Sequence, residues 1–145
     1  MPSLKASKSP TTPKKASKKT KKLQKFEDIL LARKQNLVEI LDIKNANIRD
    51  LHASNITDDS DLVSAKIQGN LDALIIEKYT IELAEIESSL QKIQDNCYGI
   101  CEMCDEPISQ ERLVIKPHAR FCITCREIYE KEIYEKEQLQ KANNP

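Results

Sequence analysis

Apolar residues recur at helical spacing over the first long stretch of the chain, from about Leu23 to Ala53. They are separated by three, four or seven positions: Leu23, Phe26, Leu30, Leu37, Leu41, Ile48 and Leu51. Neither proline nor glycine interrupts the stretch. The pattern predicts one amphipathic helix with an apolar stripe that needs a partner, because an isolated helix of this kind is marginal in water.

A second stretch, from about Asp61 to Asn96, shows a seven-residue repeat. One row holds Ile76, Leu83, Leu90 and Cys97, and a second row three residues on holds Tyr79, Ile86 and Ile93. This spacing is typical of a coiled-coil seam. Cys97 continues the first row and is therefore predicted to be a buried apolar cysteine, with a role as a competing metal ligand left as the alternative. Gly99 is placed where a left-handed cap would end the helix.

Residues 23–96 are thus predicted to form an antiparallel helical hairpin, with parallel homodimerisation as the competing arrangement. Helices of about thirty residues give an arm of roughly 45 Å. The link "ITDDSDLV", residues 56–63, would lie at the far tip and carries Asp58, Asp59 and Asp61. One aspartate suffices to cap the second helix, and Asp61 or Asp58 is near enough to its start to do so. The remaining acids are then a surplus at the tip.

Residues 97–145 are predicted to hold a zinc finger and a C-terminal helix. Two Cys-x-x-Cys pairs, separated by seventeen residues, supply four thiolates: Cys101, Cys104, Cys122 and Cys125. Four such ligands make a closed tetrahedral site, so the expected cofactor is one structural Zn²⁺. A disulfide or a redox-active dithiol is the less favoured reading. Between the pairs, "LVI" at residues 113–115 is a candidate short strand.

Composition supports a mainly helical fold without a thick core. The chain has 145 residues, 39% hydrophobic and 32% charged, with two glycines and no tryptophan. Its formal net charge of zero hides a basic segment, because residues 1–22 contain eight lysines and no acid. That segment is predicted to be a disordered tail. No apolar leader or membrane-spanning run is visible, so we expect a cytoplasmic protein with reduced cysteines and no membrane partner.

Two function classes are disfavoured by the residues. His52 and His118 are isolated, and no nucleophile–base spacing or phosphate loop is present, so the chain is not expected to be an enzyme. The cysteine spacing also resembles the GATA-type DNA-binding finger, but residues 97–130 carry only four basic residues against six acidic ones. Direct sequence-specific DNA binding by an acidic finger is not expected, because phosphate contacts need a basic surface.

The segments "YGICEMCDEPI", "RLVIKP" and "FCITC", with the hairpin tip "DDSDLV" upstream, resemble the DksA/TraR family of bacterial transcription factors. The resemblance covers about Leu23 to Tyr134. It implies a coiled coil that enters the secondary channel of RNA polymerase and modulates initiation through its tip, without contacting DNA. The family's tip motif, Asp-x-x-Asp-x-Ala, falls on Asp58, Asp61 and Val63, with valine in place of alanine.

The same resemblance implies an alarmone (ppGpp) pocket shared with polymerase. Its positions fall on Asn55, Lys116 and Arg126, while a lysine of that pocket falls on Glu85. A carboxylate at that position would repel a polyphosphate. The predicted function is transcription regulation through RNA polymerase, with ppGpp as a candidate co-regulator. The alternatives are a zinc-stabilised coiled-coil adaptor with another partner and a DNA-binding finger protein.

Overall fold

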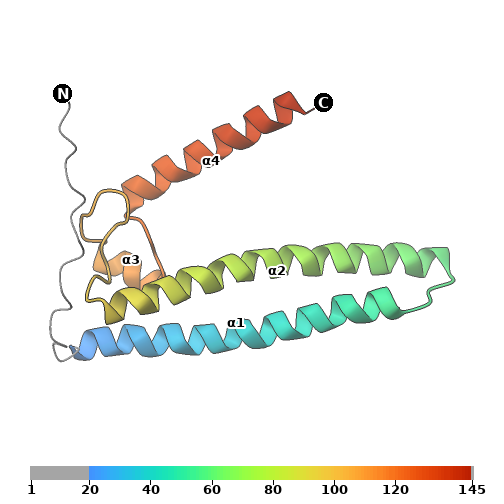
Figure 1. Ribbon diagram of the computed structural model, residues 1–145, viewed down its shortest axis with the longest axis horizontal. Helices are drawn as coiled ribbons and strands as arrows, with labels where there is room; N and C mark the ends of the chain where they lie inside the picture. The colour runs from blue at the N-terminus through green and yellow to red at the C-terminus, as the bar shows by residue number, and fades with distance from the viewer. Residues whose placement is uncertain (1–19, 145) are drawn as a thin grey trace, which may run out of the picture.

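The computed structural model describes residues 20–144 and is mainly helical, as predicted. The elements in chain order are α1 (Lys21–Ala53), α2 (Asp59–Gln94), α3 (Gln110–Ile115) and α4 (Ile123–Asn143). Helices α1 and α2 run antiparallel side by side, while α3 and the cysteine loops lie at one end and α4 leaves that end as a separate helix (Figure 1). No helix among residues 20–144 is long and apolar enough to cross a membrane.

The hairpin begins slightly before its predicted start. Helix α1 starts at Lys21, and the Thr20 hydroxyl caps it by accepting from the Leu23 N–H at 3.4 Å. Lys21 and Lys22 are therefore helical, although they were assigned to the predicted tail of residues 1–22. Residues 1–19 of that tail lie outside the described part of the chain.

The end of α2 corrects two expectations. The helix stops at Gln94, and Asn96 adopts the left-handed conformation with φ 58°. The Cys97 N–H then donates to the Lys92 carbonyl at 2.9 Å, which is the bonding of a Schellman cap. The left-handed cap is thus Asn96 rather than Gly99. Because the backbone reverses before Cys97, this cysteine leaves the heptad row and is exposed instead of buried.

The hairpin seam is best packed near the cysteine end. Leu30 and Leu37 of α1 and Ile86 and Ile93 of α2 form one buried cluster, each at most 1% exposed. Leu23, Tyr79, Leu83, Leu90 and Tyr98 pack around it. Apart from Tyr98, these are residues whose spacing predicted the seam, so the heptad pattern correctly located the contact between the helices.

A second buried cluster joins the hairpin to the finger. It combines Phe26 of α1 with six residues of the finger: Cys101, Ile108, Leu113, Ala119, Phe121 and Cys125. The ring of Tyr98 lies 5.6 Å from that of Phe26, and its hydroxyl donates to the Pro117 carbonyl at 2.7 Å. Burial raises the pKa of Tyr98 to about 12, so the phenol remains a donor. The finger is therefore packed onto the arm rather than tethered to it.

The predicted strand at residues 113–115 is wrong, because these residues end helix α3. The Ser109 hydroxyl caps this helix by accepting from the Arg112 N–H at 3.4 Å. Leu113 is buried while Val114 and Ile115 are exposed. A strand would have pointed Leu113 and Ile115 to the same face, whereas a helical turn buries one apolar residue of the three.

Candidate metal centre and acidic tip

The four cysteines of the two Cys-x-x-Cys pairs converge on one point. Their Sγ atoms all lie within 4.8 Å of one another, and the Cys104 and Cys122 sulfurs are 3.9 Å apart. A tetrahedral zinc with Zn–S bonds of about 2.3 Å places its ligand sulfurs about 3.8 Å apart. The donor set and the spacing therefore fit one structural zinc, as predicted, with no coordination position left for a substrate.

The loops around the cysteines have the backbone bonding of metal knuckles. Cys101 donates its N–H to the Glu106 carbonyl at 2.9 Å, and Asp105, with φ 59°, completes the turn by donating to the Cys101 carbonyl at 3.1 Å. The second pair lies on α4, where Cys122 is the N-cap residue and Cys125 is in the first turn. The Glu102 N–H donates to the Arg120 carbonyl at 3.0 Å and ties the two pairs together.

The surroundings of Cys101 and Cys125 shift the pKa values of these two thiols in opposite directions. Burial opposes ionisation of Cys101, but backbone N–H groups of Cys122, Cys104 and Met103 outweigh it and lower its pKa to about 6. Cys125 has a raised pKa, chiefly because of its contact with the Cys122 sulfur and then because of burial. Adjacent thiolates repel one another, and a bound Zn²⁺ would supply the positive charge that allows all four to ionise.

The three aspartates of the link lie at the opposite end of the hairpin from the cysteine cluster (Figure 1). Asp58 is the N-cap of α2, and its Oδ1 accepts from the Ser60 N–H at 2.9 Å and from the Ser60 hydroxyl at 3.0 Å. These bonds hold the pKa of Asp58 below its usual value. Asp59 and Asp61 occupy the exposed first turn, so Asp58 rather than Asp61 provides the cap.

The tip half of the hairpin is loosely filled. Val63, the third residue of the tip motif, is 59% exposed. Below the link, a groove of about 750 Å³ opens between the two helices; Leu51 and Leu62 are among its apolar walls, and Asn55 lies at its edge. Gly69 contributes to the groove because it has no side chain to fill the seam.

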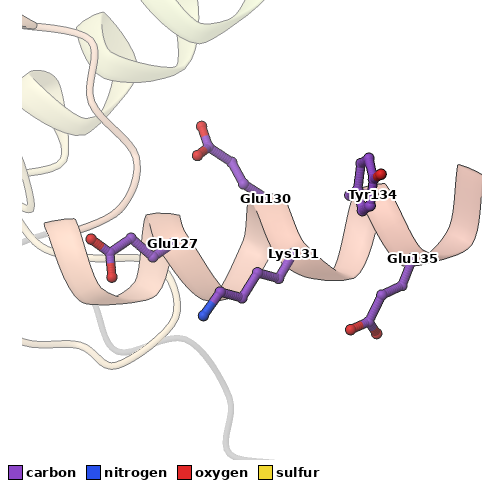
Figure 2. Close-up of a pocket in the computed structure, with 5 residues that line it drawn as sticks. All are labelled: Glu127, Glu130, Lys131, Tyr134 and Glu135. Carbon is purple, nitrogen blue, oxygen red and sulfur yellow. The ribbon is translucent and has the colours of Figure 1, made fainter.

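Helix α4 presents only a shallow surface depression. Figure 2 shows that the five residues lining it, Glu127, Glu130, Lys131, Tyr134 and Glu135, all come from this helix. From residue 130 to residue 144 every residue of this segment is exposed. A depression between side chains of a single solvated helix does not enclose a ligand, so we assign no site to it.

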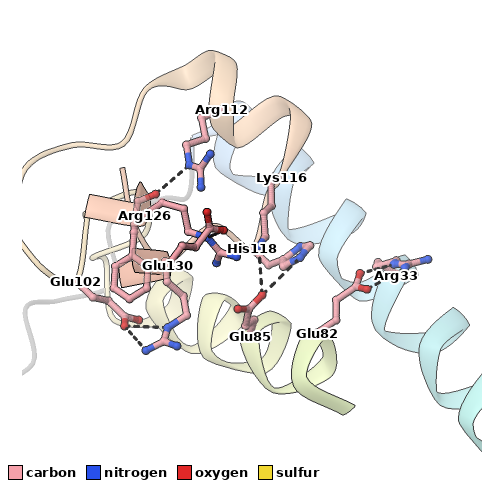
Figure 3. A network of polar contacts seen from close by, with 11 residues as sticks. Arg33, Glu82, Glu85, Glu102, Arg112, Lys116, His118, Arg126 and Glu130 are labelled. Atoms are coloured by element: carbon pink, nitrogen blue, oxygen red, sulfur yellow. Dashed lines mark hydrogen bonds and ion pairs between the residues drawn. The ribbon is translucent and has the colours of Figure 1, made fainter. Parts of the chain in front are cut away.

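The residues predicted for ppGpp do not come together within this chain. Lys116 and Arg126 lie at the finger, whereas Asn55 lies in the link at the other end of the hairpin (Figures 1 and 3). The Lys116 ammonium is 3.5 Å from the Glu85 carboxylate, and Arg126 pairs with Glu130 at 2.6 Å. Glu85, at a position where the resemblance implies a lysine, therefore contacts one of the residues predicted to bind ppGpp.

His118 is a neighbour of Glu85 that sequence reasoning did not find. Its Nε2 lies 3.8 Å from the Glu85 carboxylate, beside Lys116 (Figure 3). Burial, and then the charge of Lys116, lower the pKa of His118. The imidazole is therefore mainly neutral at pH 7, and the contact with Glu85 joins the finger to α2 without a full ion pair. A lone histidine gives no sequence signal for such a contact.

The four basic residues of the finger are engaged inside the protein. Arg112 donates from Nε to the Phe121 carbonyl at 2.9 Å, and Arg120 donates to Glu102 at 2.9 Å. Lys116 and Arg126 have the carboxylate partners already described. Arg112 and Arg120 thus link parts of the finger, Lys116 contacts α2, and Arg126 pairs within α4.

The fold and the cysteine cluster define a C4 zinc-finger protein with a long helical arm. Residues 98–131 match the prokaryotic dksA/traR C4-type zinc finger. The RNA polymerase-binding transcription factor DksA of Salmonella typhimurium is 30% identical over 113 residues, covering 76% of this chain and 74% of that protein. The chain belongs to the DksA/TraR family, which is a family of transcription factors and not of enzymes.

Two further proteins are similar to this chain, and the first supports the same placement. The structure of transcription factor DksA2 from Pseudomonas aeruginosa matches with a TM-score of 0.64 and 29% identity, covering 77% of this chain and 85% of that chain. An uncharacterised protein of Aquifex aeolicus is 46% identical over 50 residues, and that match spans only 34% of either protein. The finger match spans residues 98–131 alone, whereas the match to DksA2 covers 77% of the chain. The similarity to DksA2 therefore extends beyond the finger into the helical arm.

Proposed function

We propose that this chain regulates transcription by binding RNA polymerase and inserting the acidic tip of its hairpin into the secondary channel. Its relatives in Salmonella and Escherichia coli are RNA polymerase-binding transcription factors. The observation that carries the proposal is the position of Asp58 and Asp61, exposed at the end of the arm farthest from the cysteine cluster. A slender arm with carboxylates at its end is suited to reaching into a narrow channel.

The arm is long and its tip is acidic, and both properties support the proposal. Helix α2 has 36 residues, and at about 1.5 Å per residue it extends roughly 54 Å. Asp58 is held as an ionised acceptor by Ser60, and Asp61 follows one turn later on a neighbouring part of the helix surface. The acidic chain after residue 22, with 23 acidic residues against 15 basic ones, would favour entry into a basic channel mainly by steering association.

The test is an in vitro transcription assay with the double variant Asp58→Asn and Asp61→Asn. We expect the variant to bind polymerase with similar affinity and to lose its effect on promoter complexes, because asparagine keeps the shape and the cap but not the charge. Asp59→Asn is the matched control, since Asp59 lies in the same exposed turn but outside the motif. A fully active double variant would contradict the tip mechanism.

The proposal includes ppGpp only as a weak co-regulator of this chain. A polyphosphate approaching Lys116 would have to displace or compensate Glu85, and Arg126 is similarly paired with Glu130. We expect Glu85→Lys to strengthen the response to ppGpp in the same transcription assay by roughly tenfold, the equivalent of about 1.4 kcal/mol. Glu87→Lys is the control, because Glu87 lies on the same helix and pairs with Lys34 instead. An unchanged response would place the nucleotide elsewhere.

A further inference from the structure

The seam between α1 and α2 buries one charged side chain, that of Asp72, where an apolar residue is expected. Asp72 lies seven positions before Tyr79, in the row of α2 that also holds Ile86 and Ile93, and Lys44 lies seven positions after Leu37 in the inward-facing row of α1. The Lys44 Nζ is 2.9 Å from the Asp72 Oδ1, and the side chain of Asp72 is completely buried. The pair is therefore part of the helix interface and not a surface ion pair.

Asp72 is also the only buried residue between positions 38 and 85. The apolar cluster of the hairpin ends at Leu37 and Ile86, so the remaining length of the arm has no other fully buried side chain. The Lys44–Asp72 contact is therefore the most deeply buried contact between the two helices in this part of the arm.

The bonding of the carboxylate is incomplete. Its Oδ1 accepts from both Lys44 and Gln68, the latter at 3.1 Å, while its buried Oδ2 has no hydrogen-bond partner. The Lys44 ammonium, aided by Gln68, outweighs the effect of burial and holds the pKa of Asp72 below its usual value, so the carboxylate stays charged. Such a pair gains little stability over two apolar residues, because desolvation offsets much of the attraction.

Selection of one register between the two helices explains this pair better than a gain in stability does. If the helices slid by one step of the seam, Asp72 would face Leu41 or Ile48, and a buried charge would lose its partner. Apolar seam residues tolerate such a slip, whereas a single polar seam pair is known to select one register of a coiled coil. We propose that Lys44 and Asp72 determine the register of α1 against α2 in the outer arm and thereby position the tip carboxylates. Only the consequence at the tip rests on the proposed function.

The test compares charge reversal with apolar replacement in the full chain loaded with zinc. Lys44→Asp alone and Asp72→Lys alone place like charges together, and each should lower the thermal midpoint by roughly 5–15 °C. The two reversals combined should recover more than half of that loss. The double replacement Lys44→Leu and Asp72→Leu should be at least as stable as the wild type, yet its tip should give more than one set of amide NMR signals.

The cross-helix pair Lys34–Glu87 provides the matched control. Its atoms are 3.1 Å apart, but its side chains are 39% and 54% exposed. Reversing both of its charges should leave one set of tip signals and shift the midpoint by no more than about 2 °C. The inference is overturned if the double-leucine variant keeps a single set of tip signals at wild-type shifts, or if the combined reversal recovers nothing. Because these readouts need no polymerase, they are independent of the Asp58 and Asp61 transcription test.

Discussion

The two halves of the hairpin are built from the same heptad spacing but are held together differently. Near the finger, Leu30, Leu37, Ile86 and Ile93 are almost completely buried, and the aromatic contact of Phe26 continues the core into the finger. Toward the tip, a charged pair replaces the apolar cluster, and a groove replaces close packing. The half near the finger therefore has a buried apolar cluster, whereas the only fully buried side chain of the tip half, Asp72, makes a polar contact.

The difference fits the proposed function, in which the finger end anchors the arm and the tip acts. Residues with few buried apolar contacts open locally at low free energy, so the tip half should exchange its amide hydrogens sooner than the base half. Several apolar side chains on the outer face of α2, Val63, Ile67, Leu71 and Leu74, are at least half exposed in the tip half. The arm therefore combines a stable base with an outer part that retains freedom to adapt.

The largest expected loss of structure comes from removing the metal site. This change should unfold the finger and leave the helices of the arm folded. Structural zinc contributes an apparent binding free energy of about 10–16 kcal/mol, so Cys101→Ser or strong chelation should unfold the finger. We expect amide protection to vanish over residues 98–131, where the finger match lies, while most of the helical circular-dichroism signal of α1 and α2 remains.

Cys97→Ser is the control for the metal site, because Cys97 is exposed and lies outside the sulfur cluster. Cys97→Ser should leave both the amide protection of the finger and the helical circular-dichroism signal unchanged. Loss of all helical signal on chelation would show that the arm cannot persist without the finger, and equal damage from Cys97→Ser would place Cys97 among the ligands.

Replacing the two glycines by alanine should change stability by a smaller amount, and the change should have opposite signs in the arm and in the finger. Gly69 lies inside α2, and an added Cβ would meet only Leu51 Cδ1 at 3.7 Å, so Gly69→Ala should stabilise the arm by about 0.5–1 kcal/mol. Gly99 has φ +83° and its Cβ would lie 3.3 Å from Leu113 Cδ1. Gly99→Ala should therefore destabilise the finger by about 1–2 kcal/mol.

Chemical denaturation of each variant measures both changes. If Gly69→Ala also destabilised the protein, the seam near the tip would be packed as tightly as the seam near the finger, contrary to the difference between the two halves. Hydrogen exchange sharpens the result, because Gly69→Ala should slow exchange around the groove and leave the finger unaffected.

Sequence periodicity could locate the helices and the metal site because both depend on spacing. The apolar rows and the two Cys-x-x-Cys pairs repeat at intervals that the backbone converts directly into contacts. Cys97 was misplaced because a periodic row does not reveal where the chain turns, and that turn depends on the left-handed Asn96. Lys44 and Asp72 were missed for another reason: each is an ordinary charged residue until the opposite helix brings its partner within 2.9 Å.

The smallest expected effect concerns the cap at the tip. The Ser60 N–H and then its hydroxyl lower the pKa of Asp58, so the capped carboxylate adds stability above its unfolded pKa of about 3.9 and loses it as the pH falls through the lower folded value. Ser60→Ala removes the hydroxyl bond and keeps the N–H. In this variant the pKa of Asp58, measured by NMR titration of the carboxyl group, should rise part of the way toward the ordinary value. Ser64→Ala, on the exposed surface of the same helix, should leave the pKa of Asp58 unchanged. An Asp58 titration midpoint that does not move in Ser60→Ala would mean that the hydroxyl plays no part in keeping the tip charged.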